Sequence, residues 1–160
     1  MKHVVYRMAA WFAAVFSTPW ALFHQQRIQA RGRPLTAVEA GVAKGLGVSD
    51  INNIFVMEVE RVPNPLRWSF GLMEKCGTCV SEVDGITLGH GIYVSCAASN
   101  SLKLMAHELV HVGQYERAGS VWSFMIEYIY QCLVIGYHDS AWEVEARAES
   151  ATALVAMAGD

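Results

Sequence analysis

Two histidines and a glutamate stand at a spacing that can bind and use a metal ion: His107, Glu108 and His111, in the segment His-Glu-Leu-Val-His. Residues four apart on a helix share one face, so both imidazoles can reach the same ion. A zinc ion held in this way lowers the pKa of a bound water toward neutrality, and Glu108 can take the proton as that water attacks a carbonyl. The segment therefore predicts two zinc ligands and a general base.

A catalytic zinc also needs a third protein ligand and one open position. Of the carboxylates that follow, Glu116 is too close along the same helix, and Glu127 lies within an apolar stretch. Glu143 and Glu145 begin the last expected helix, where a carboxylate also interacts favourably with the helix dipole. The interaction with the helix dipole accounts for one of these two glutamates. The residues alone therefore leave either Glu143 or Glu145 as the third ligand.

Two segments resemble the gluzincin clan of zinc peptidases: LMAHELVHVGQYERAG at 104–119 and GYHDSAWEVEAR at 136–147. They look closest to minimal zincin-like domains of bacteria, including those linked to contractile injection systems, and are similar to the HtpX group of membrane endopeptidases. In those families the third ligand is the first Glu of an E-x-x-A-D segment. The resemblance thus implies that Glu143 is the third ligand, with Glu145 as the alternative. It also implies a Zn²⁺-dependent endopeptidase.

Further roles follow from the same resemblance. Ala146 corresponds to the small residue that lets two helices approach, whereas Arg147 replaces an Asp that commonly orients a histidine ligand. Many members supply a His or Tyr to hold the developing oxyanion, for which Tyr137 is the first candidate and His138 the second. Members also bind an extended peptide substrate along a strand beside the active helix, here expected at 86–94.

The elements expected to position these residues form a small α+β domain that is mostly helical, with a short antiparallel sheet beside the motif helix. Thr36 and Glu39 make a capping box for a helix that closes at Gly47. Alternating patterns at 54–62 and 86–94 predict two strands. Three more helices are expected at 101–118 (capped by Ser99 or Asn100), 121–135 and 141–157.

Residues 1–31 form an apolar N-terminal segment, and residues 32–160 form the single zincin-like domain. An apolar run follows Lys2 and Arg7, and Thr18 with Pro19 has the form of a helix start. We therefore expect a first helix, a break, and a second helix from about residue 19 to 30. The segment fits a helix packed on the domain or lying on a membrane surface through residues 4–23, a signal or anchor, or plain core.

The amino-acid composition limits the classes of function that the chain can have. Hydrophobic residues make up 53% of the chain and charged residues 17%, with a mean hydropathy of +0.24. The net charge is −3 without a basic block, which argues against nucleic-acid binding. Cys76 and Cys79 form a lone C-x-x-C that suits free thiols, a disulfide or a second metal site.

Three functions are compatible with these features. The first is a zinc endopeptidase, and the second is a catalytically silent zincin-fold binding or assembly module beside a secretion apparatus. The third is a membrane-attached accessory protein in which the motif is incidental. The intact Glu108 favours the first, since a structural zinc needs no base. Location in the cytoplasm, at a membrane or outside the cell stays open, as does the oligomeric state.

Overall fold

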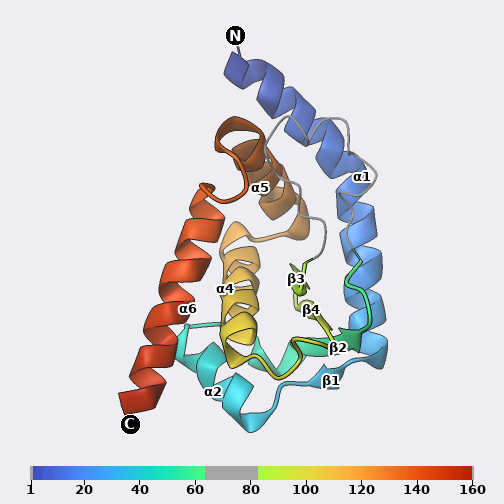
Figure 1. Cartoon of the computed structure of the whole chain (residues 1–160). Helices are drawn as coiled ribbons and strands as arrows, with labels where there is room; N and C mark the ends of the chain where they lie inside the picture. Colours follow the sequence, from blue (N-terminus) through green and yellow to red (C-terminus); the bar gives the residue numbers. More distant parts are fainter. Residues whose placement is uncertain (1, 64–82, 160) are drawn as a thin grey trace.

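The structure is a computed structural model that describes residues 2–63 and 83–159. It is an α+β domain, as the sequence predicts, in which helices surround a small four-stranded sheet (Figure 1). The Cys76-Cys79 pair lies outside the described residues. In chain order the elements are α1 (Lys2–Arg31), β1 (Arg33–Pro34), α2 (Ala37–Gly45), the 3-10 turn η1 (Ile51–Asn53), β2 (Phe55–Val59), β3 (Gly85–Leu88), β4 (Gly91–Ser95), α4 (Leu102–Ala118), α5 (Val121–Ile135) and α6 (Ala141–Gly159).

The sheet is mixed and has the strand order β1-β2-β4-β3. β1 and β3 are antiparallel to their neighbours, but β2 and β4 are parallel, so the expected antiparallel pairing of these two regions is wrong. The reason is the hairpin formed by β3 and β4. Its first strand lies on the outside, and its returning strand therefore runs beside β2 in the same direction.

Residues 86–94, expected as one strand, form most of this hairpin. Gly89 and His90 make the turn, and Gly89 has a φ of +63°, a backbone conformation that favours glycine. β4 is buried along its whole length, whereas β3 is the edge strand and lies against α4. Among the described strands, only β3 therefore has an unpaired edge beside the motif helix.

The motif helix α4 is fixed by its ends and by one apolar face. Ser101 accepts a hydrogen bond from the Leu104 backbone N–H (3.2 Å) and is the N-cap, in place of the expected Ser99 or Asn100. The Ser99 hydroxyl instead donates to the Cys96 carbonyl within the preceding turn. Gly119 ends the helix with a φ of +77°.

The apolar face of α4 packs on the sheet. Ala106, Leu109 and Val112 are fully buried at a spacing of three residues, in a cluster with residues from α2, the sheet and the turn before it: Val42, Ile54, Val56, Ile92 and Val94. Burial of each Leu-sized side chain contributes about 2 kcal/mol. A different face of α4, which carries the two motif histidines, is left for α6.

The N-terminal helix α1 is continuous, so the expected break near Pro19 is wrong. A proline inside a helix removes one backbone hydrogen bond and costs about 3 kcal/mol. Packing of α1 on α5 and the sheet offsets this cost, because Ala14, Ala21 and Ile28, seven residues apart, are all buried there. The helix ends at Arg31, close to the expected residue 30, and at Gly32 a Cβ would lie 2.7 Å from the Ile28 carbonyl oxygen.

Within the described residues, no single helix is both long and apolar enough to cross a membrane. α4 and α5 pass this test only as a pair, and they are bent by 113° at the break between them.

Candidate metal centre

The three expected ligands lie together where α4 meets α6. His107 and His111 are one turn apart on α4, and Glu143 is in the first turn of α6. The two Nε2 atoms are 3.2 Å apart, and the two oxygens of Glu143 face one each: Oε2 lies 3.4 Å from His107 Nε2, and Oε1 lies 3.4 Å from His111 Nε2. Their ligand atoms all fall within 4.8 Å of one another, the one group of this kind in the part of the chain that the structure describes.

These separations suit a zinc ion. Zinc binds imidazole nitrogen and carboxylate oxygen at about 2.0–2.1 Å, and tetrahedral corners at that radius are about 3.4 Å apart. The separation of the two Nε2 atoms, 3.2 Å, is close to one such edge, and a carboxylate oxygen lies 3.4 Å from each of them. Two imidazoles and one carboxylate leave a fourth corner for water or substrate, which is the composition of a catalytic site rather than a closed structural one.

Gln114 determines which nitrogen of His111 carries the proton. Its side-chain oxygen lies 2.7 Å from His111 Nδ1, while its amide nitrogen donates to the Trp142 carbonyl (2.8 Å) and to Glu145 (2.7 Å). Since the nitrogen faces two acceptors, the oxygen must face the imidazole, and Nδ1 must be the protonated atom. Neutral His111 therefore has its lone pair on Nε2, which faces the other two ligands.

Glu145, the alternative third ligand, lies outside the cluster. Besides its bond from Gln114, it pairs with Arg117 at 2.5 Å. Glu145 thus helps to fix the orientation of Gln114, whose side-chain oxygen contacts His111. Gln114 itself was missed from the sequence, although its position three residues after His111 puts the two side chains on one helix face.

Glu143 is held in place from several sides. The residue is 1% exposed, and the Tyr128 hydroxyl on α5 donates to one carboxylate oxygen at 2.9 Å. Burial alone would raise the pKa of Glu143, but the two imidazoles and the Tyr128 hydroxyl beside it outweigh that effect and keep its pKa well below the usual range. Glu143 is therefore an anion, the form in which a carboxylate binds metal.

Glu108, the expected base, faces β3. The Thr87 hydroxyl lies 2.7 Å from its Oε2 and 3.0 Å from its backbone oxygen. Burial is the main cause that raises the pKa of Glu108. The backbone of β3 is also close, since a Cβ on Gly85 would lie 2.6 Å from Oε1. The edge strand thus fixes the orientation of this carboxylate.

Tyr137 lies in the loop before α6, close to both carboxylates. Burial raises its pKa, and the charges of Glu143 and Glu108 raise it further. Its phenol therefore stays protonated and can donate a hydrogen bond at the site. His138 is exposed and belongs to the surface of the loop.

Arg147, expected to stand where similar families have an Asp, contacts the loop before α6. Its guanidinium donates to the His138 carbonyl and lies 4.0 Å from Glu143 Oε2. Ala146 beside it is fully buried, as expected for a residue at the contact of two helices. In this structure the side chain that contacts His111 Nδ1 is that of Gln114.

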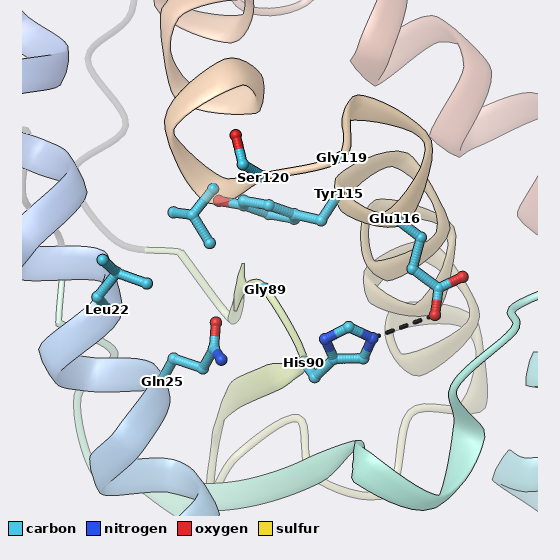
Figure 2. Close-up of a pocket in the computed structure, with 9 residues that line it drawn as sticks. Leu22, Gln25, Gly89, His90, Tyr115, Glu116, Gly119 and Ser120 are labelled. Atoms are coloured by element: carbon cyan, nitrogen blue, oxygen red, sulfur yellow. Dashed lines mark hydrogen bonds and ion pairs between the residues drawn. The ribbon is translucent and has the colours of Figure 1, made fainter.

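A pocket of about 230 Å³ lies elsewhere, between α1, the β3–β4 turn and the junction of α4 with α5 (Figure 2). His90 is half-buried at the edge of this pocket, and its Nε2 lies 3.1 Å from Glu116 Oε1. The Glu116 carboxylate also accepts the backbone N–H groups of Ser49 (2.8 Å) and Asp50 (2.9 Å). Glu116 therefore ties both the β3–β4 turn and the chain before η1 to the end of α4.

Comparison of the chain with protein-family models, with curated proteins and with solved structures found no match.

Proposed function

We propose that this protein is a zinc-dependent endopeptidase. The observation that carries the proposal is the convergence of two imidazoles and a buried carboxylate at the edge lengths of a zinc tetrahedron, with Glu108 next to the first ligand. His107, His111 and Glu143 would hold the ion. Bound there, zinc supplies a water of lowered pKa and polarises a carbonyl oxygen.

The protein's own residues have separate tasks. Glu108 takes the proton of the attacking water and returns it to the leaving nitrogen, while Thr87 holds one of its oxygens in place. Tyr137 donates to the oxyanion that develops on the substrate carbonyl. An extended peptide adds to the free edge of β3, which puts its scissile bond beside Glu108, since Gly85 and Thr87 of that strand both lie against this side chain.

The matched pair Glu108→Gln and His107→Ala tests the proposal. Wild type and Glu108→Gln should each bind about one zinc, and His107→Ala should bind far less. Cleavage of a diverse peptide library should occur with wild type alone. If Glu108→Gln cleaves as well as wild type, the enzyme proposal fails. Zinc binding with no cleavage by any form would favour the silent binding module instead.

A further inference from the structure

The outer face of α1 is the largest concentration of exposed apolar side chains in the described residues. Nine of the fourteen large hydrophobic side chains that are exposed there lie on this one helix: Val4, Val5, Met8, Trp11, Phe12, Val15, Phe16, Leu22 and Phe23. From Val4 to Phe16 they recur at spacings of three and four residues, and Leu22 and Phe23 lie seven residues after Val15 and Phe16, so all nine form a single stripe along the helix. We call these nine residues the α1 stripe.

The α1 stripe lies on a different face of the helix from the residues that pack on the domain. The opposite face carries Ala10, Ala14, Ala21 and Ile28, which are buried against α5 and the sheet. Figure 1 shows α1 on the outside of the domain, with its N-terminal end projecting beyond the other helices. A surface helix of a water-soluble domain normally has charged residues on its outer face. Phe16 instead is 78% exposed and Phe23 62%.

The charges of α1 indicate which kind of partner the α1 stripe binds. The helix contains four of the twelve Lys and Arg residues, Lys2, Arg7, Arg27 and Arg31, and none of the fifteen Asp and Glu residues, although the chain as a whole carries −3. Lys2 precedes the stripe, and Arg27 and Arg31 follow it. Basic residues at both ends of an apolar, aromatic stripe are typical of a helix that lies in the interface of an anionic membrane.

We propose that the α1 stripe docks this protein on the surface of anionic membranes, with α1 parallel to the bilayer plane. Trp11, Phe12 and Phe16 enter the boundary between headgroups and acyl chains, where aromatic side chains are favoured. The basic residues meet the lipid phosphates. Docking requires no rearrangement of the domain, because the face of α1 that packs on α5 is not used.

Co-sedimentation of the full chain with lipid vesicles tests the proposal. Binding should be clear with vesicles that contain about one third phosphatidylglycerol, and much weaker with phosphatidylcholine alone or at high salt. Brominated acyl chains should quench the tryptophan emission of wild type. They should quench Trp11→Phe clearly less, because Trp11, 50% exposed, is the indole placed in the stripe.

Matched variants separate the stripe from apolar or basic character in general. The double variant Phe12→Ser, Phe16→Ser should partition about 30-fold more weakly. Its control is Val155→Ser, Met157→Ser on α6, which also replaces two exposed apolar residues and should bind as wild type does. Arg27→Glu with Arg31→Glu should lose at least about ten-fold on anionic vesicles, whereas Lys44→Glu with Lys103→Glu should change little.

Several outcomes would overturn the proposal: no binding to anionic vesicles, equal loss in the stripe variant and its α6 control, or equal quenching of wild type and Trp11→Phe. A second copy is the competing occupant of the stripe. It would be recognised as a dimer of the full chain in solution that the Phe12→Ser, Phe16→Ser variant dissociates without any effect on vesicles. Zinc content should be the same in all these variants, so the test is independent of the metal centre.

Discussion

Substitution of Gln114 by Met should weaken zinc binding without removing a ligand. The Gln114 oxygen lies 2.7 Å from His111 Nδ1, and the residue is fully buried. Met fills a similar volume but offers no strong acceptor. The Nδ1–H is then left unpaired, and nothing holds the proton away from the nitrogen that faces the ion.

The magnitude has two parts. Loss of the outer hydrogen bond of a ligating histidine typically lowers metal affinity 10- to 100-fold, about 1.4 to 2.8 kcal/mol. The metal-free protein should lose about 1 to 3 kcal/mol of stability as well, because Nδ1–H and the Trp142 carbonyl both lose a buried partner. The two parts are measured separately, by zinc competition against a fluorescent chelator and by urea unfolding in excess chelator.

Glu145→Gln is the matched control for this experiment. Its side chain can still accept the amide proton of Gln114, so the bond to His111 survives, and only the pairing with Arg117 is weakened. Its zinc affinity should stay within a few-fold of wild type. The reasoning is refuted if Gln114→Met binds zinc as tightly as wild type, or if both variants lose affinity to the same extent.

Further predictions concern the base, the phenols and a stabilising ion pair. Gly85→Ala places a Cβ 2.6 Å from Glu108 Oε1, so peptide cleavage should fall by about 100-fold or more while zinc content stays near wild type; unchanged cleavage would contradict the role of β3. Tyr137→Phe should lower kcat by about 10²-fold with little change in zinc affinity. Tyr128→Phe should mainly weaken zinc binding, because Tyr128 donates to Glu143. Assays of both variants on one peptide substrate distinguish these two roles. Glu39→Gln should cost about 2 kcal/mol near neutral pH, since Glu39 binds Arg33 at 2.7 and 2.9 Å and the Thr36 N–H at 2.7 Å. Burial would raise the pKa of Glu39, but these bonds lower it overall, so their contribution is present above the unfolded pKa and is lost as the pH falls through the folded one. Urea midpoints of wild type and Glu39→Gln should accordingly converge in acid, and a constant difference would rule out this linkage.

Much of the helical frame could be predicted because its signals are local. The capping box of Thr36 and Glu39 and the glycines that end α2, α4 and α5 all act within a few residues of the chain. The placing of Glu143 near the histidines followed from a resemblance to known families. What failed depends on contacts between distant segments. The parallel pairing of β2 with β4 follows from the hairpin, and the continuity of α1 through Pro19 follows from its packing on α5.

The contacts of the site residues also divide into local ones, which the sequence can indicate, and contacts between distant segments, which it cannot. Thr87 reaches Glu108 from another element, and nothing in the pattern of either segment indicates the contact. Gln114 could have been found, since it is one turn from His111. Glu145 could not be separated from Glu143 by sequence, because only the rotation of α6 against α4 decides which carboxylate faces the histidines.

The connection between the ligands also has a thermodynamic consequence. His111 and Glu143 are separated by the whole of α5, so an ion bound to both closes a loop of the chain in the way that a covalent cross-link does. The unfolded chain cannot offer such a site, and ion binding therefore adds directly to the free energy of unfolding. At a free zinc concentration of 100 times Kd, the gain is about 2.7 kcal/mol. The supply of zinc would then set how firmly α6 is held to the domain, and with it how much of the chain resists other proteases.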